Sequence, residues 1–141
     1  MSIMTNYLEE KLIDHLFKAV AYSHSSPSTW HVGLHTAAFG DDSSGGTEVS
    51  TSGTNYARIA VTRGSGFTRA SSSDARTVEN AANVVFGVPS ANWGQVTHVG
   101  IYDATTGGNM IIEAQLQFAK TINNGDPAPK FQAGELKFTF D

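Results

Sequence analysis

The chain has 141 residues, which is enough for one domain and too few for two of ordinary size. Only 16% of the residues are charged, the net charge is −4 and there is no cysteine. These values exclude disulfide scaffolds, thiolate metal sites and cysteine nucleophiles, and they argue against nucleic acid as a partner. No apolar run approaches the ~20 residues that span a bilayer, so we expect no membrane association.

The N-terminal segment carries the only convincing helical pattern. Its apolar residues recur at helical spacing: Leu8, Leu12, Ile13, Leu16, Phe17 and Val20. This pattern predicts an amphipathic helix over about residues 6–20, with Asn6 as its N-cap. A helix this short is marginal alone, so we expect it to pack on a sheet or on a neighbouring subunit. Leu12, Leu16 and Phe17 are therefore candidate assembly contacts.

The rest of the chain, from about residue 29 to residue 141, predicts strands. Alternating or continuous apolar runs lie near residues 30–35, 57–62, 84–88, 97–102, 110–118 and 136–140. We expect residues 40–54 to form a long polar loop and residues 64–74 a loop or an edge strand. About seven or eight antiparallel strands are typical of a β-sandwich or barrel-like fold. The predicted fold is all-β, a single domain over residues 1–141, with one N-terminal α-helix.

Alternation also predicts which aromatic side chains are buried. Trp30, Phe138 and Phe140 fall on inward faces, and Phe118 ends the longest alternating run. Trp93 lies between two strands rather than within one. A loop tryptophan can cover the end of a sandwich, contact a neighbouring subunit or act as a ligand platform. We favour the first interpretation and keep Trp93 as a further candidate assembly contact.

The histidines do not form a recognisable metal site. His31 and His35 share a strand face but are separated by ~13 Å, and His98 can meet only one of them across a sheet. We therefore favour structural or surface histidines over a metal centre. Asp103 opens a turn, and no nucleophile elbow or phosphate-binding loop is present. We expect no catalytic, cofactor-binding or metal-binding residue.

Several segments resemble a family of small structural proteins of tailed bacteriophage virions, often labelled tail-fibre-like. The similarity covers nearly the whole chain in the right order, and the segment over residues 92–103 is the most specific. The matching segments are residues 5–17 (TNYLEEKLIDHLF), 32–36 (VGLHT), 46–50 (GTEVS), 56–58 (YAR), 92–103 (NWGQVTHVGIYD) and 106–109 (TGGN).

The resemblance implies a structural role in a virion assembled in the cytoplasm of the bacterial host, not an enzyme. Within that role we favour a capsid cement or decoration protein on the outside of the shell, because a fibre normally needs length, repeats or a trimeric stalk, and a chain of 141 residues shows none of these. It would bind the major capsid protein. The alternative is a tail component, such as a baseplate, adaptor or short tail fibre unit, that binds other tail proteins. Either role predicts a homo-oligomer, such as a trimer or part of a larger ring.

Two other classes of function stay open at this stage. A carbohydrate- or receptor-binding module would use Trp93, Tyr56 or Tyr102 as a surface on which a sugar ring stacks. An enzyme would gather titratable side chains such as those of His31, His35, His98 and Asp103 in one cleft.

Overall fold

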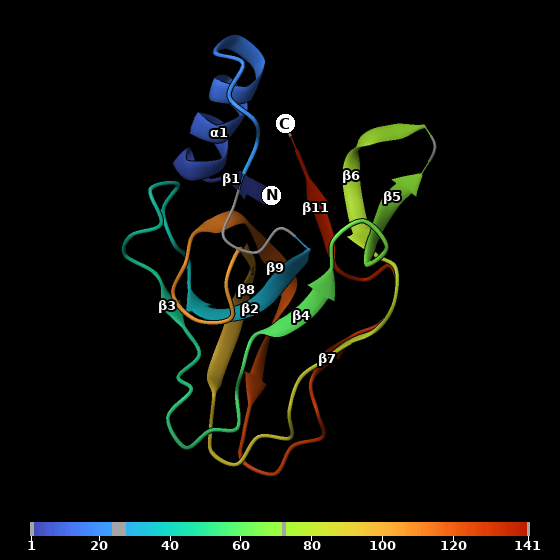
Figure 1. The fold of residues 1–141 in the computed structure, drawn as a ribbon. Coiled ribbons are helices and arrows are strands. Elements are labelled where there is room, and N and C mark those ends of the chain that lie inside the picture. Colours follow the sequence, from blue (N-terminus) through green and yellow to red (C-terminus); the bar gives the residue numbers. More distant parts are fainter. Residues whose placement is uncertain (1, 24–27, 72, 141) are drawn as a thin grey trace.

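The computed structural model describes residues 2–23, 28–71 and 73–140 as antiparallel sheets with one helix (Figure 1). The elements are β1 (Ser2–Met4), α1 (Asn6–Phe17), β2 (Thr29–Ala37), β3 (Thr47–Glu48), β4 (Ile59–Thr62), β5 (Phe67–Ser71), β6 (Asp74–Asn80), β7 (Val84–Val85), β8 (Gly94–Tyr102), β9 (Met110–Ile122), β10 (Lys130–Phe131) and β11 (Lys137–Thr139). Every strand pair described is antiparallel. The predicted all-β fold with one N-terminal helix is therefore confirmed.

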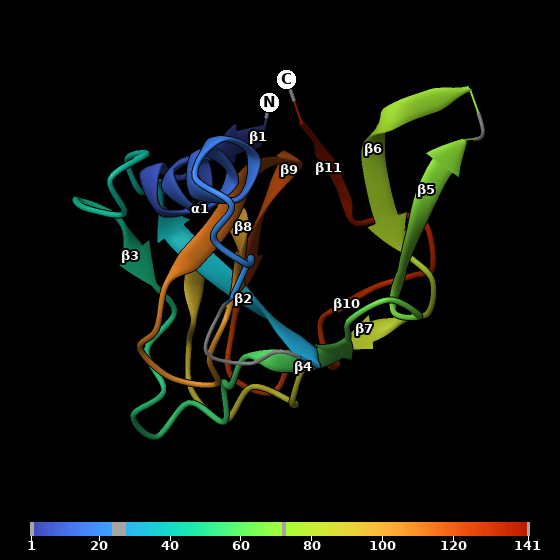
Figure 2. The same cartoon turned by 45° about the horizontal axis from the view of Figure 1, so that its top comes forward.

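The strands form one large and two small sheets. The large sheet has the order β1-β9-β8-β2-β3, and β4 also pairs with β2. A second sheet has the order β11-β6-β5, and β10 pairs with β7. Figure 2 shows α1 on one side of the molecule and the β5–β6 hairpin on the other, with β1 and β11 between them.

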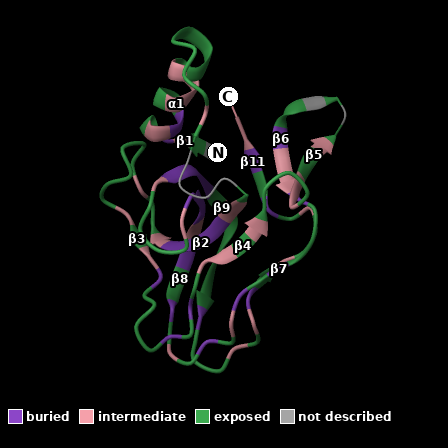
Figure 3. Cartoon of the chain, in the orientation of Figure 1, coloured by how far each residue is buried: buried purple, intermediate pink, exposed green. Residues whose placement is uncertain are grey.

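One face of the large sheet forms the centre of the hydrophobic core. The buried side chains on that face come from three adjacent strands: Val32, Leu34, Val99, Ile101, Ile112 and Ala114. Leu136 and Phe138, from the C-terminal segment, are buried in the same cluster. Figure 3 shows the contrast between the buried central strands and the exposed surface of α1. The core thus joins residues from α1 to β11.

Trp93 lies in this core, where it joins an aromatic cluster. Its ring packs edge-on against Tyr56, with the ring centroids 5.3 Å apart, and Phe86 completes the cluster. The indole Nε1–H donates a hydrogen bond of 2.8 Å to the carbonyl of Thr54. Only 5% of Trp93 is exposed. Trp93 therefore closes the core over the segment around residue 54 and has little surface left for a partner.

The helix begins at the predicted residue but ends three residues earlier than predicted, and its N-cap differs. Its N-cap is Thr5, not Asn6, because Thr5 has an extended backbone and its hydroxyl accepts a hydrogen bond from the N–H of Leu8. Ala19 adopts a left-handed conformation with φ 54°, which ends the helix before Val20. The predicted range of 6–20 is therefore corrected to Asn6–Phe17.

Two polar segments contribute strands to the sheets: residues 40–54, which were predicted to be a loop, and residues 64–74, for which an edge strand was one of the two predictions. Residues 40–54 contain β3, and the N–H of Val49 donates to the carbonyl of Leu34, so that Val49 is buried in the core. Residues 64–74 contain β5, the edge strand of a hairpin with β6. Neither β1 nor β6 was predicted, because β1 is very short and the side chains of β6 are mostly polar.

The strict alternation predicted for β9 is wrong at Phe118, which is 78% exposed. Val96 pairs with Lys120 and His98 with Gln115, so Thr97 alone lies opposite residues 116–119 of β9. This large bulge changes the direction of the following side chains. Of the three other aromatic residues predicted to be inside, Phe138 is buried, whereas Trp30 and Phe140 are half-buried.

We predict that Trp93→Ala lowers the free energy of unfolding by about 3–5 kcal/mol, because it leaves a cavity among buried aromatic rings. Phe118→Ala is the matched control, since that ring is exposed, and it should change stability by less than about 0.5 kcal/mol. Urea unfolding followed by circular dichroism measures both values. Equal stability losses in the two variants would contradict the assignment of Trp93 to the core.

Candidate assembly surface

The first turn of α1 is anchored to the sheet. The hydroxyl of Thr5 donates to the carbonyl of Ile111, and the backbone N–H of Thr5 donates to the same carbonyl. Leu8 is buried, and Leu12 is half-buried against the core. These contacts use one side of the helix and only its N-terminal half, so the rest of α1 extends away from the sheet (Figure 1).

The C-terminal half of α1 exposes a set of apolar side chains that we call the α1 apolar face. It consists of Ile13, Leu16, Phe17 and Val20, the last of which directly follows the helix. Phe17 is 81% exposed and Leu16 is 68% exposed. Contiguous apolar side chains in water are unfavourable and typical of an interaction surface.

The candidate assembly contacts from the sequence thus separate into three groups. Leu16 and Phe17 lie on the α1 apolar face, where a partner can reach them. Leu12 packs mainly against the core of its own chain. Trp93 is buried and therefore corrected to a core residue.

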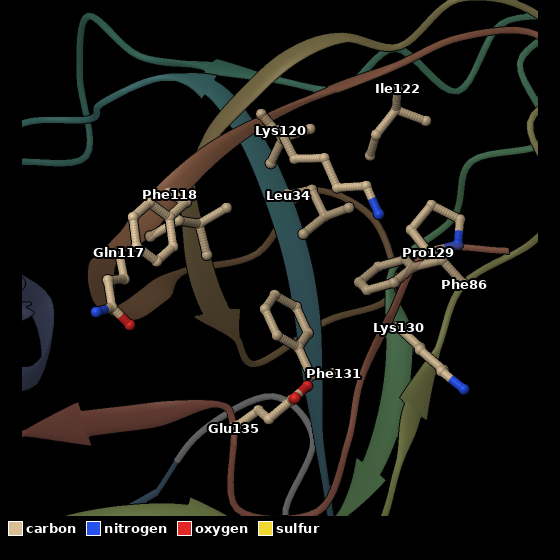
Figure 4. Close-up of a pocket in the computed structure, with 12 residues that line it drawn as sticks. Leu34, Phe86, Gln117, Phe118, Lys120, Ile122, Pro129, Lys130, Phe131 and Glu135 are labelled. Carbon is tan, nitrogen blue, oxygen red and sulfur yellow. The ribbon is translucent and has the colours of Figure 1, made fainter. Parts of the chain in front are cut away.

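A second apolar surface lies at the other end of the molecule, between the second half of β9 and β10. This β9–β10 groove has a volume of about 360 Å³. Leu34 lies near its middle, Phe118 lies on one side, and Lys120 and Lys130 lie toward the other (Figure 4). The remaining lining includes buried apolar side chains such as Phe86. The groove therefore combines an apolar floor with a partly cationic rim.

The second face of the large sheet is also buried, but its side chains are polar. His35 is fully buried, and its Nδ1 lies 2.5 Å from Oε1 of Glu113. Its Nε2 lies 2.7 Å from the hydroxyl of Tyr102. With Glu113 ionised and the ring neutral, Nδ1–H donates to the carboxylate and Nε2 accepts from Tyr102. Burial first, then the charge of the Glu48 carboxylate, raises the pKa of Tyr102, so its hydroxyl keeps the proton that it donates.

Two paired glycines make room for this network. Gly33 and Gly100 are opposite each other on β2 and β8. A Cβ atom on Gly100 would lie 2.6 Å from Cε1 of His35, and one on Gly33 would lie 3.0 Å from the ring of Tyr102. Since His35 is held on both ring nitrogens, it has no space to move aside. The glycines are thus required by close approach of side chains.

An ion pair extends the network toward the loops. Arg58 donates two hydrogen bonds of 2.8 Å to the carboxylate of Glu48, one from Nε and one from Nη2. Its Nη1 donates to the carbonyls of Ala104 and Gly107, and its guanidinium lies 3.4 Å from the centroid of the Tyr102 ring. Arg58 therefore ties β3 and the turn after β8 to the sheet.

Two of the titratable residues singled out from the sequence, His35 and Asp103, are buried and hydrogen-bonded within the chain. The two ring nitrogens of His35 have Glu113 and Tyr102 as hydrogen-bond partners. His98 lies opposite His35 on the neighbouring strand β8 but is not one of these partners. Asp103 is buried and accepts hydrogen bonds from the backbone and side chain of Asn109. Nδ1 of His31 is buried and has no hydrogen-bond partner among the described residues, and burial lowers the pKa of this ring. His24 lies outside the described residues.

Within residues 2–23, 28–71 and 73–140, no cluster of three or more His, Asp or Glu side chains is placed to hold a metal ion. In the same part of the chain, no helix has the length and apolar character needed to cross a membrane.

Sequence reasoning missed the polar network, although one signal was visible. Glu113 is the only charged residue in the apolar run of residues 110–114. A carboxylate in a run that is otherwise buried requires an internal partner. The identity of that partner, His35, comes from a contact between strands distant in sequence.

The ion pair makes stability depend on pH. Burial raises the pKa of Glu48, but hydrogen bonds from Arg58 and Tyr56, together with the Arg58 charge, lower it by more, to below its ordinary value of 4.5. A lowered folded-state pKa stabilises the protein above pH 4.5, and this contribution is lost as pH falls through the folded pKa.

We therefore expect the unfolding free energy of the wild type to fall between about pH 5 and pH 3 more steeply than that of Glu48→Gln. Urea unfolding at a series of pH values measures the two slopes. Glu10→Gln, at an exposed position on α1, controls for the loss of one negative charge. An identical slope in the wild type and Glu48→Gln would contradict the conclusion that Arg58 lowers the pKa of Glu48.

Comparison with known proteins identifies a family that matches nearly the whole chain. A family model described as "Podophage GP4 fiber I protein gp80" matches residues 3–139. None of the curated proteins compared with the chain matches it. The matched range runs from β1 to β11 and so includes α1, the polar network and the β9–β10 groove.

Proposed function

The chain belongs to the family of the podophage GP4 fiber I protein gp80, and on this premise we propose that it is a unit of a phage tail fibre, attached to other virion proteins through the α1 apolar face. Family membership makes it a structural component of a phage virion. This supports the tail alternative better than the capsid cement protein that chain length alone favoured.

The observation that carries the proposed attachment is the exposure of Leu16 and Phe17 on a helix held at its other end. Burying one such side chain contributes about 1.5–3 kcal/mol, so the α1 apolar face offers a partner several times that amount. A helix whose apolar face fits a groove is a common mode of protein recognition. Other virion proteins are the partners that a fibre unit requires.

The burial of the other candidate residues argues against a carbohydrate-binding or catalytic function. A carbohydrate-binding role would depend on Trp93, Tyr56 and Tyr102. Each of these side chains is only 3–5% exposed, so none of the three rings is free to stack on a sugar. His35, Glu113 and Tyr102 hydrogen-bond to one another inside the sheet. We therefore propose a non-catalytic role. Homo-oligomerisation stays a prediction.

The structure separates the effects of two substitutions on α1. Leu12→Asp places a charge against the core and should destabilise the fold, whereas Phe17→Asp changes an exposed side chain and should leave stability within about 0.5 kcal/mol of wild type. We expect Phe17→Asp to reduce the amount of chain in purified virions, because the charge would be buried in the interface. The measurement uses phage lacking the wild-type gene and supplied with each variant in trans.

Val88→Asp is the matched control, since Val88 is an exposed apolar residue outside α1, and it should be incorporated normally. Electron microscopy with a labelled chain then locates it on the particle. Normal incorporation of Phe17→Asp would rule out α1 as the attachment, and a label on the shell alone would rule out the tail fibre.

A further inference from the structure

Two apolar surfaces of this chain stay uncovered in the part that the structure describes, and the charged residues beside them have opposite signs. The α1 apolar face lies beside acidic residues, and the β9–β10 groove lies beside lysines. Each surface is therefore a suitable counterpart for the other.

The cationic surface is the β9–β10 groove, and its charge comes from Lys120 and Lys130. Both line the groove, both are exposed, and neither forms an ion pair in the part of the chain that the structure describes. Glu135 also lines the groove, but its Oε2 accepts a hydrogen bond of 2.6 Å from the backbone of Gln132. In a protein of net charge −4, two unpaired lysines at one apolar groove favour an acidic, apolar occupant.

The acidic surface is the α1 apolar face, beside which Glu9 and Glu10 lie. Glu9 precedes Ile13 by four residues, and Glu10 precedes Phe17 by seven, spacings that place them on the same side of the helix. Both glutamates are exposed and have no ion pair within the described residues. Asp14 is already paired with Lys18 at 2.8 Å. The α1 apolar face thus ends in two free carboxylates.

A chain cannot fill its own groove with its own helix. In both views, α1 lies at one end of the molecule and β7 lies toward the other, and Figure 2 shows β10 beside β7 (Figures 1 and 2). The first turn of α1 is also fixed to β9 through Thr5. The helix that suits the groove must therefore come from another molecule.

We infer that the β9–β10 groove binds α1 of a second copy of this chain, with Phe17 and Leu16 against the apolar floor and Glu9 and Glu10 facing Lys120 and Lys130. This inference rests on the proposed function, because it names the partner of the α1 apolar face. The two contacting surfaces differ, so the contact is head-to-tail and either closes into a ring or continues as a chain of copies. Phe118, at the edge of the groove, would cover one side of the inserted helix.

Sedimentation equilibrium of the purified full-length chain tests this contact. We expect concentration-dependent self-association that Phe17→Asp weakens by roughly tenfold or more, as expected for a central aromatic side chain of an interface. Lys120→Glu with Lys130→Glu should also weaken it, without loss of folding, because both positions are exposed. Arg69→Glu, an exposed cation on β5, is the matched control and should associate like the wild type.

A charge exchange identifies the two surfaces as partners. Glu9→Lys with Glu10→Lys should weaken self-association, as should Lys120→Glu with Lys130→Glu, but an equal mixture of these two double variants should associate at the wild-type level. Failure of the mixture to associate, or a wild-type chain that stays monomeric at millimolar concentration, would overturn the inference. If Phe17→Asp still lowers incorporation into virions, the proposed function stands and the helix binds a different virion protein.

Discussion

The structure depends on burial of the central strands β2, β8 and β9 on both faces. One face is apolar, but the other contains His35, Tyr102 and Glu113, and buried polar groups destabilise a fold unless they form hydrogen bonds. Each of these three side chains has a partner in the network, and the glycine pair at positions 33 and 100 provides the space. Arg58 then connects this network to the loops that cover it.

The periphery shows the reverse arrangement. The interior satisfies its polar groups, whereas α1 leaves Phe17 and Leu16 in water and β9 leaves Phe118 exposed at a bulge. These side chains contribute little to the stability of the single chain. Their most direct physical use is contact with another protein, which agrees with membership in a fibre-protein family.

Chain length is a weak guide to the place of a protein in the virion, and family membership supports the tail alternative better. The absence of a repeat or stalk favoured a shell protein, because a fibre was assumed to need length within one chain. A fibre unit can instead gain length by association, and then its contact surfaces matter more than its size. The helix held at only one end, with its apolar side chains free, is suited to such association.

The sequence by itself determined the local periodicities: the helix around Leu8 and Leu12, most strands, and the family resemblance. Helical and strand spacing are short-range properties, which is why they can be read along the chain. Only the tertiary structure decided that Trp93 is buried, that Phe118 is exposed beyond a bulge, and that Glu113 pairs with His35. Those outcomes depend on register and contact between strands far apart in sequence, and a single residue's shift of register exchanges the inner and outer faces of a strand.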